Sequence, residues 1–516
     1  MMQINYLLLG KSRAMTEKKI GFVGTDGRTL LAALETSRSR SELYPGAYRG
    51  VVVKGTGAME PFTQKMGWPV DFMPVPDNSA SSYAAALIRA FQAGDLDVAL
   101  VMPEGLLFEG LVDRVTDAGF GDRIIGAASA GVEYEADKIA GKRFCEKAGV
   151  PVAPAWTEAE ARDYPAVLKT CLAYLHEFGG AVLKYPYSAG GKGARIMLNT
   201  WDVKDVYDGL MKDYKDAYTR DCGKKSPWPL LIEARMSGVE ISFTILVDQA
   251  GHYQILPTAM DYPERFERPP GLDNPITGGM GSISPHPLES PALLALADAT
   301  LARPLIRLMA EQGALRPCVL YPGCFVSFDG NFKPTAIRVC EINIRPGEPE
   351  FQPVVKRLRN LGALVAAMAD GRLDEVAPEV RSDQLSLCIA LVTGPGGPQQ
   401  QKGYPWSLTK GEVVEMDFDY FDKKKITVIP SAMDYVEGAF KSDGSRVAYL
   451  LANATVKAGQ TAGQAAEPLR QKLLNAFDNG KIRVIPREDD KGNRLALRRD
   501  IGVHYHQAEA LKSSGQ

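Results

Sequence analysis

Histidine is scarce in this 516-residue chain, with only five, at positions 176, 252, 286, 504 and 506. No two of them have the i, i+4 spacing by which a helix presents a pair of imidazoles to zinc. The sequence therefore argues against histidine-based metal or acid–base chemistry. It directs attention to carboxylates, lysines and backbone amides instead.

Cysteine offers no pattern either. The seven cysteines are scattered and contain no C-x-x-C pair. An odd, unpatterned set favours reduced thiols over a disulfide framework or a zinc site, and it predicts a cytoplasmic protein. No apolar run approaches the ~20 residues that cross a bilayer, so no membrane partner is expected.

An excess of charge of either sign is also lacking, since 60 Lys and Arg oppose 62 Asp and Glu. Such a chain has no global field that would recruit nucleic acid, so any anion site must be local. Its expected partners are small molecules. The length suggests about three or four domains.

The first part of the chain alternates short apolar segments with helical periodicity. The expected strands are residues 19–24, 51–53, 71–75 and 97–102, and the expected helices include 82–93 and 106–118. This order predicts an α/β domain with a doubly wound parallel sheet. Later segments read as α+β, with antiparallel strands and a mostly β end. The predicted domains are 15–136, 137–200, 201–370 and 371–516.

A glycine loop between two apolar segments is the first chemical signal. Residues 187–194 contain Gly190, Gly191, Lys192 and Gly193, and Lys184 lies just upstream. Glycines let backbone N–H groups turn toward a phosphate, and lysines add positive charge. Nucleotide phosphate binding is the favoured interpretation, and a flexible hairpin is the alternative.

A second turn, Gly24 to Gly27, is a weaker phosphate signal. Phe22 stands where G-x-G-x-x-G requires its first glycine, so a plain tight turn is the alternative. An anion at the N-terminus of the following helix fits either interpretation.

Carboxylates gather in residues 339–350, which begin as an alternating strand and end in a Pro/Gly-rich turn. Side chains two apart share a face, so Glu341 and Asn343 should converge while Cys340 and Ile342 pack on the other side. Hard oxygen ligands suit Mg²⁺ when substrate phosphates complete its shell, and Arg345 can hold an anion nearby. The alternative is a surface strand with ordinary polar residues.

Four segments resemble the phosphoribosylamine–glycine ligase family, which has the ATP-grasp fold. Residues 102–113, which include Glu104, resemble its G-P-E-x-P-L-x-x-G-x-x-D, and 277–285 resemble T-G-G-M-G-A-Y-S-P. Residues 341–352 resemble E-x-N-A-R-F-G-D-P-E-x-Q, and 498–502 match its closing R-R-D-I-G. The resemblance spans about 19–505.

This resemblance implies an enzyme that uses ATP and Mg²⁺ or Mn²⁺ to join glycine to phosphoribosylamine, as a monomer or small homo-oligomer. The implied ATP-binding residues are Lys138, Lys142, Lys184, Gly190, Gly191, Lys192, Gly193, Glu233, Ala234, Arg235, Met236 and Glu240. The implied metal ligands are Glu341 and Asn343, and Arg345 and Lys192 would act in catalysis. Acceptor substrates would contact Gly24, Gly27, Arg28, Glu104, Thr277, Gly278, Gly279, Met280, Gly281 and Arg345.

The acceptor positions depart most from the family pattern. Its G-N-G-G-R-E-H turn is here Gly-Thr-Asp-Gly-Arg-Thr-Leu, which puts Asp26 where a substrate phosphate is expected. Ile276 replaces the Asn before T-G-G-M-G. A carboxylate–amine ligase with another acceptor, or a non-catalytic nucleotide-binding paralogue, are therefore alternatives.

Overall fold

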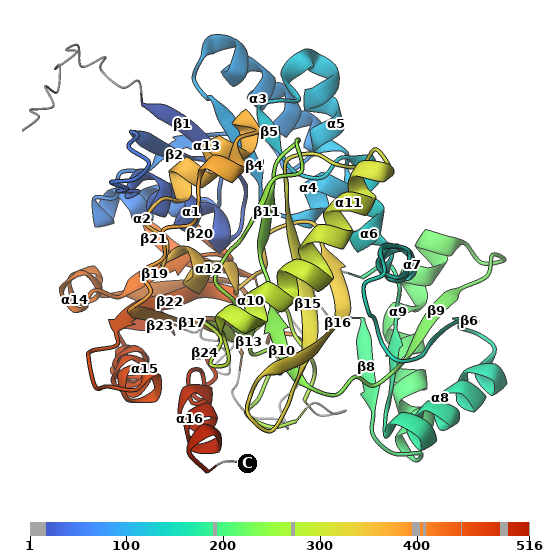
Figure 1. Cartoon of the computed structure of the whole chain (residues 1–516). Helices are drawn as coiled ribbons and strands as arrows, with labels where there is room; N and C mark the ends of the chain where they lie inside the picture. The colour runs from blue at the N-terminus through green and yellow to red at the C-terminus, as the bar shows by residue number, and fades with distance from the viewer. Residues whose placement is uncertain are drawn as a thin grey trace, which may run out of the picture.

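The computed structural model describes residues 17–188, 193–269, 274–394, 403–405, 409–444, 446–485 and 494–514. Figure 1 shows an N-terminal α/β part, a small lobe at the right and a β-rich C-terminal part, arranged around central strands. The expected parallel N-terminal sheet, followed by antiparallel sheets, is confirmed.

The N-terminal strands form a parallel sheet in the order β3-β2-β1-β4-β5. Their bounds are β1 (Lys18–Gly24), β2 (Tyr48–Lys54), β3 (Asp71–Met73), β4 (Val98–Val101) and β5 (Ile124–Ile125). The accompanying helices are α1 (Gly27–Ser37), α2 (Met59–Met66), α3 (Ala80–Ala93), α4 (Glu104–Phe108), α5 (Leu111–Val115), η1 (Thr116–Phe120) and α6 (Ser129–Ala136). Strands covered on both faces read as unbroken apolar runs, as in 51–53.

The single helix expected over 106–118 is wrong. Two short helices, α4 and α5, stand there, because Gly110 adopts a left-handed conformation with φ of 73° between them. Such a residue ends one helix and redirects the chain into the next.

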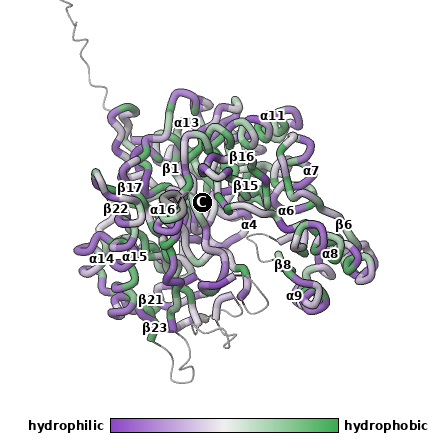
Figure 2. The backbone as a smooth tube through the Cα atoms, turned by 60° about the horizontal axis from the view of Figure 1, so that its bottom comes forward, coloured by the Kyte–Doolittle hydropathy of each residue, from purple (hydrophilic) through white to green (hydrophobic). Residues whose placement is uncertain are grey.

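The small lobe is an antiparallel sheet in the order β6-β9-β7-β8, covered by helices. Its elements are β6 (Trp156–Glu160), α8 (Tyr164–Phe178), β7 (Ala181–Lys184), β8 (Ala194–Met197), α9 (Asp202–Cys222) and β9 (Pro229–Ala234). Helix α7 (Lys138–Ala148) precedes the lobe in the chain and packs against α6. A separate apolar core holds it together, with Tyr218 stacked on Trp228 at 4.9 Å. In Figure 2 polar and apolar residues mix along α8 and α9, as expected for helices packed on one face.

The central sheet has the order β10-β15-β11-β12, with β16 paired to β15. Its strands are β10 (Val239–Ser242), β11 (Ile245–Val247), β12 (Tyr253–Ile255), β15 (Cys318–Phe328) and β16 (Pro334–Asn343). The helical segment before β15 comprises α10 (Pro291–Ala297), η2 (Asp298–Ala302) and α11 (Arg303–Glu311).

A β-bulge in β16 overturns one expectation about its faces. Gly323 pairs with Glu341 and Cys324 with Val339, so Cys340 is left without a partner of its own. The extra residue breaks the alternation. Cys340 therefore opens to the same cleft as Glu341, whereas Ile342 packs in the core as expected.

The C-terminal part is built on antiparallel strands in the orders β13-β14-β17-β22-β19 and β20-β21-β18-β23, with β24 beside β17. The strands are β13 (Met260–Asp261), β14 (Gly281–Ser284), β17 (Gln384–Thr393), β18 (Thr409–Met416), β19 (Thr427–Pro430), β20 (Met433–Val436), β21 (Ala439–Gly444), β22 (Arg446–Thr455), β23 (Ile482–Ile485) and β24 (Leu495–Ala496). The helices that follow β16 in the chain are α12 (Phe351–Val355), α13 (Leu361–Asp370), η3 (Leu373–Glu375), α14 (Phe418–Lys424), α15 (Ala462–Asp478) and α16 (His504–Ser514). Of these, α13 packs against α1 and the N-terminal parallel sheet. The segment 277–285, which resembles T-G-G-M-G-A-Y-S-P, thus contains a strand, β14.

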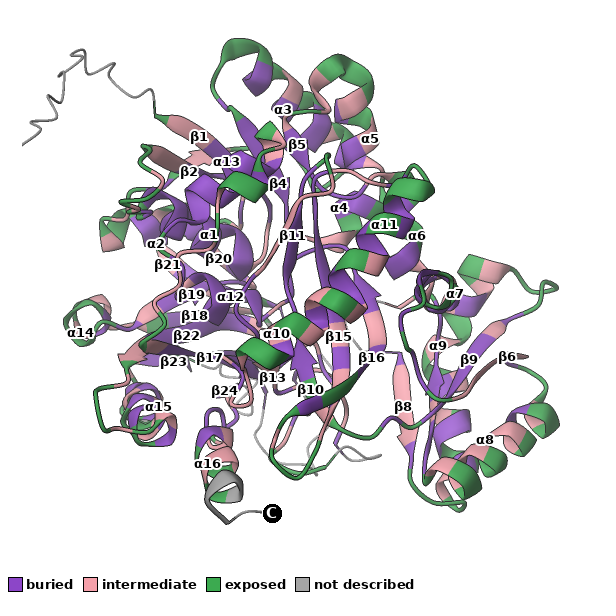
Figure 3. Cartoon of the chain, in the orientation of Figure 1, coloured by how far each residue is buried: buried purple, intermediate pink, exposed green. Residues whose placement is uncertain are grey.

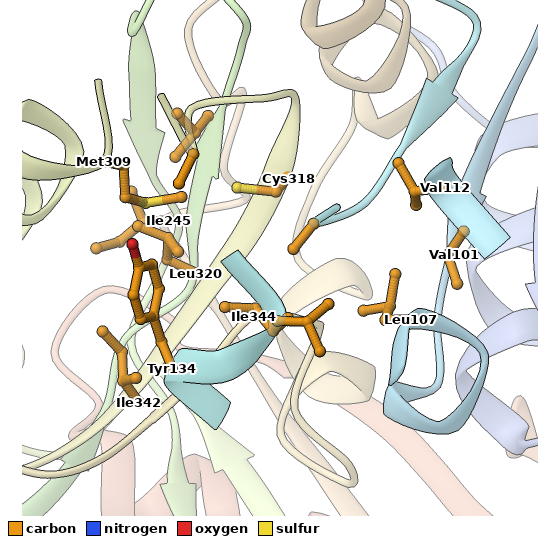
Figure 4. Close-up of a cluster of buried hydrophobic side chains, with 14 of the residues drawn as sticks. Val101, Leu107, Val112, Tyr134, Ile245, Met309, Cys318, Leu320, Ile342 and Ile344 are labelled. Atoms are coloured by element: carbon orange, nitrogen blue, oxygen red, sulfur yellow. The ribbon is translucent and has the colours of Figure 1, made fainter. Parts of the chain in front are cut away.

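One continuous apolar core joins the N-terminal sheet to the central sheet. Figure 4 shows Leu107 and Val112 on one side and Leu320 and Ile342 on the other, with Ile344 between them. Figure 3 shows that the strands of the N-terminal and central sheets are largely buried, whereas the outer faces of the helices are exposed. Among the described residues, no helix combines the length and apolar character that a bilayer crossing needs.

We expect Leu320→Ala to lower the free energy of unfolding by ~2–5 kcal/mol, because it leaves a cavity in this shared core. Leu320 is fully buried, whereas Leu172 on α8 is 38% exposed. Leu172→Ala is the control and should change that free energy by no more than ~0.5 kcal/mol. Urea denaturation measures both, and equal losses would contradict the shared core.

Candidate active site

A cleft of about 460 Å³ lies between the small lobe and the central sheet. Strands β7, β8 and β9 contribute residues from the lobe, and β10, β15 and β16 contribute residues from the central sheet. The sequence-predicted residues that line it are Lys138, Lys184, Glu233, Ala234, Arg235, Met236, Glu240, Thr277, Gly278, Glu341 and Arg345. Residues from distant parts of the chain therefore share one cavity.

Two buried lysines meet one buried carboxylate beneath the cleft. The ammonium groups of Lys142 and Lys184 both form ion pairs with Glu233, which is 1% exposed. Burial alone would raise the pKa of Glu233, but Lys142 and Lys184 outweigh it and the pKa is lowered. Burial would likewise lower the pKa of Lys184, yet Cys340 and Glu233 raise it. Glu233 and Lys184 therefore both stay charged.

Lys142 lies deeper than Lys184 and is not part of the cleft lining. Its Nζ donates to the backbone oxygens of Val339 at 3.1 Å and Cys340 at 3.0 Å. Lys184 Nζ lies 3.4 Å from Cys340 Sγ. These contacts tie α7 and β7 to the bulge in β16.

Lys138 and Glu341 form a third ion pair of the site, with Nζ and Oε2 3.1 Å apart. Lys138, together with Lys184 and Arg345, lowers the pKa of Glu341 to about 2, against the opposing effect of burial. The Glu341 carboxylate is therefore ionised at any physiological pH, as a metal ligand must be.

Asn343 is fixed by its neighbours, with its Nδ2 donating to the backbone oxygen of Tyr321 at 3.1 Å. Its Oδ1 accepts from Arg345 at 3.5 Å, and the residue is 2% exposed. Glu341 and Asn343 thus offer hard oxygens, which fit Mg²⁺. In the described part of the chain, no group of three or more His, Cys, Asp or Glu side chains could hold a metal ion together.

Three apolar residues of the cleft lining were not predicted. Val182 and Ile196 of the lobe and Phe325 of β15 line the cleft together with the predicted Met236. Val182 shares a face of β7 with the predicted Lys184. Strand alternation around Lys184 could have found Val182. The backbone at Ala234 and Arg235 donates to Ala155 and Gly180, which fixes the end of β9.

An acidic wall faces the lysines across the cleft and is formed by Glu240, Asp261, Glu264 and Glu350. Burial, together with Glu350 and Glu240, raises the pKa of Asp261 well above its usual range. Burial also raises the pKa of Glu350. Asp261, Glu264 and Glu350 were not predicted as site residues. Asp261 and Glu264 stand in no motif, and Glu350 belongs to the carboxylate-rich run 339–350, in which only Glu341, Asn343 and Arg345 were predicted to act.

Arg345 connects the cleft to the N-terminal part. Its Nε lies 3.2 Å from carboxylate oxygens of both Glu104 and Glu135. Glu135 also accepts from the backbone N of Ile344 at 2.8 Å. The structure therefore brings Glu104 to Arg345, although Glu104 does not line the cleft.

The N-terminal turn contains an internal ion pair outside the cleft lining. Asp26 caps α1 by accepting from the backbone N of Arg28 at 3.0 Å, and its Oδ2 lies 2.7 Å from the Arg28 guanidinium. That guanidinium also donates to the backbone oxygen of Pro346. A side chain at Gly27 would approach the Tyr449 ring to 2.8 Å, and one at Gly24 would approach Pro103 equally closely.

Only the start of the 277–281 loop reaches the cleft. Gly279 has φ of 96°, and a side chain there would collide with Pro349. Met280 is fully buried, and Gly281 lies in β14 against the backbone of Cys388. Gly190, Gly191 and Lys192 lie outside the described residues, and Gly193 accepts from the backbone N of Tyr185 but does not line the cleft.

The acidic wall generates a pH prediction for the protein without metal or nucleotide. The Glu240 side chain is exposed to the cleft, but the loss of hydration within it, together with the carboxylates of Glu264, Glu341 and Glu350, raises its pKa to about 7. In the unfolded chain the Glu240 carboxyl group ionises near its ordinary pKa. Its contribution to the free energy of unfolding is therefore complete below that pKa and is lost as the pH rises through 7.

We therefore expect Glu240→Gln to raise the melting temperature relative to wild type at pH 8, with the difference vanishing near pH 4. Glu177→Gln on α8 removes an exposed carboxylate and serves as the control. A Glu240→Gln difference that does not change with pH would contradict the raised pKa.

A family model and several known proteins match this chain in sequence. The family model described as phosphoribosylglycinamide synthetase, ATP-grasp (A) domain, matches residues 136–351. A phosphoribosylamine–glycine ligase of Brucella melitensis is 29% identical over 80% of this chain and 88% of its own. One from Rhodopirellula baltica is 28% identical over 70% of this chain and 77% of its own.

Solved structures agree on the fold. The crystal structure of a phosphoribosylamine–glycine ligase from Thermotoga maritima aligns with a TM-score of 0.65 at 20% identity, covering 93% of this chain and 99% of that one. The biotin carboxylase domain of a Hydrogenobacter thermophilus 2-oxoglutarate carboxylase, solved with MgADP and bicarbonate, aligns with a TM-score of 0.56 at 15% identity, covering 93% and 91%.

Proposed function

Since the chain belongs to the phosphoribosylamine–glycine ligase family of ATP-grasp proteins, we propose that it joins glycine to 5-phosphoribosylamine at the expense of ATP. The products are glycinamide ribonucleotide, ADP and phosphate, a step of purine biosynthesis. The enzyme would act in the cytoplasm, as a monomer or small homo-oligomer.

One observation carries this proposal: Lys138, Lys184, Glu341 and Arg345 line the same cleft as Thr277 and Gly278. A ligase that transfers a phosphoryl group must bring together cations for the phosphates, an ionised oxygen ligand for the metal and a loop that holds the acceptor substrate. Such a reaction needs no nucleophile from the protein, which agrees with the scarcity of histidine.

In the first step a carboxylate oxygen of glycine attacks the γ-phosphorus of ATP. The bond to ADP breaks and glycyl phosphate forms. In the second step the amine nitrogen of phosphoribosylamine attacks the glycyl carbonyl and loses a proton, and inorganic phosphate leaves. Both steps need reactants held in line and negative charge neutralised, away from water.

The residues divide this work. Lys138, Lys184 and Lys192 would contact the ATP phosphates, and Lys142 would hold Glu233 and hence Lys184 in place. The apolar residues around Met236 would cover the adenine, and Glu240 would accept from the ribose hydroxyls. Glu341 and Asn343 would bind Mg²⁺ or Mn²⁺, which neutralises charge on the phosphates.

For the identity of the acceptor substrate there is a second candidate. The Asp26 carboxylate pairs with Arg28 at the N-terminus of α1, where an anionic group would otherwise bind. A carboxylate–amine ligase whose acceptor has no phosphate at that place is therefore the second candidate. A non-catalytic nucleotide-binding protein fits less well, because the cleft retains its cations and the ionised Glu341.

The test is ADP release with glycine and phosphoribosylamine supplied together and separately. We expect saturable release that depends on both, and rescue of a purine auxotroph that lacks this step. Saturable release with another amine, and none with phosphoribosylamine, would establish the second candidate instead.

We expect Glu341→Ala to lower kcat by at least ~10²-fold, since it removes a group that stabilises charge in the transition state. Glu177→Ala, on the exposed face of α8, is the control and should retain wild-type turnover. Near-normal turnover of Glu341→Ala would refute the metal assignment.

A further inference from the structure

The C-terminal sequence Arg-Arg-Asp-Ile-Gly at 498–502 lies outside the cleft lining but contacts the chain that forms one of its walls. Strand β24 precedes it and pairs with β17, with Ala496 opposite Val392. Figure 1 shows β24, β13 and α16 in the same lower part of the molecule. The motif is thus anchored to the C-terminal sheet before it reaches the cleft wall.

Arg498 makes the main contact. The residue is 5% exposed, and its Nη1 donates to the backbone oxygen of Glu264 at 2.9 Å and to its Oε2 at 3.1 Å. Its Nε donates to Asp500 Oδ1 at 2.8 Å. The guanidinium also lies 5.2 Å from the centroid of the Tyr262 ring. The planar guanidinium group of arginine has N–H donors on several sides, which is what lets one side chain bind Glu264 and Asp500 together.

A second contact holds the same segment from the other side. The backbone N of Gly502 donates to the Tyr262 hydroxyl at 2.9 Å. The same hydroxyl lies 2.8 Å from His504 Nδ1. Because Tyr262 is 1% exposed, these bonds are shielded from water. Residues 498–504 therefore hold both Tyr262 and Glu264.

The held segment in turn positions the loop at the cleft. The oxygen of Pro263 accepts from the backbone N of Thr277 at 2.7 Å and from its hydroxyl at 2.8 Å. Glu264 forms an antiparallel bridge with Ile276, and Met280 N donates to Tyr262 at 2.8 Å. Glu264, Ile276 and Thr277 all line the cleft.

We propose that Arg498 is a positioning residue for this wall. It fixes Glu264 and the backbone of 262–264, and through them it places Thr277 and Gly278 for acceptor binding. The assignment of this wall to the acceptor rests on the proposed function. The ATP side is on β7, β9 and α7, which Arg498 does not contact.

The test compares Arg498→Ala with Arg499→Ala. Arg499 is the neighbour in the sequence, but its side chain is half exposed and pairs with Asp478 on α15. We expect Arg498→Ala to raise the KM for phosphoribosylamine or glycine by at least ~10-fold, as misplacement of a binding wall would. The Kd of Arg498→Ala for Mg-ATP should stay within ~2-fold of the wild-type value, since the contacts of Arg498 lie on the side of the cleft away from the proposed ATP site. Arg499→Ala should leave all three constants unchanged.

Arg498→Lys keeps the charge but loses the fork, so it should fall between wild type and Arg498→Ala. This variant also keeps the proposal testable if Arg498→Ala does not fold. An equal loss of Mg-ATP and acceptor binding in Arg498→Lys would show a merely structural role and overturn the proposal. Unchanged KM values in both variants would overturn it too.

Hydrogen exchange separates this proposal from the proposed function, because it needs no turnover. In Arg498→Ala or Arg498→Lys the amides of Thr277 and Met280 should exchange faster than in Arg499→Ala. The paired strands β7 and β9 should exchange at wild-type rates. Unchanged exchange at Thr277 would contradict the positioning role, even if the enzyme used other substrates.

Discussion

Three charged side chains from three elements meet beneath the cleft, where Glu233 at the end of β9 lies between Lys142 of α7 and Lys184 of β7. Removing Glu233 would leave two buried lysines without the carboxylate that they share, and such losses cost about 3–5 kcal/mol. The contacts of Lys142 with the backbone of β16 extend the network to the strand that carries Glu341. The small lobe and the central sheet therefore share one electrostatic anchor.

The two sides of the cleft differ in charge for a chemical reason. Lysines on the lobe side match a triphosphate, whereas the wall around Glu240, Asp261 and Glu350 is acidic and favours an ammonium group or a metal. Arg345 lies between them, paired with Glu104 and Glu135. A substrate with a carboxylate and an amine can meet both requirements at once, which suits glycine.

Local sequence patterns predicted much of the fold but little of its ion pairing. Apolar runs located the strands of the parallel sheet, because strands covered on both faces have no polar positions. The helix break at Gly110 and the bulge at Cys340 were missed, since each depends on tertiary context. The partners of Glu233 and Arg498 were also missed, because Lys142 and Glu264 lie far away along the chain. The family resemblance supplied candidate residues, whereas only the structure shows which of them share a cavity.

In the proposed reaction, ATP activates a carboxylate by phosphorylating it in this cleft. Glycine labelled with ¹⁸O in its carboxylate tests it directly, by mass spectrometry of the phosphate released with phosphoribosylamine. Attack of that carboxylate on ATP transfers one labelled oxygen to each inorganic phosphate. Phosphate without label, formed together with the ligated product, would contradict the account.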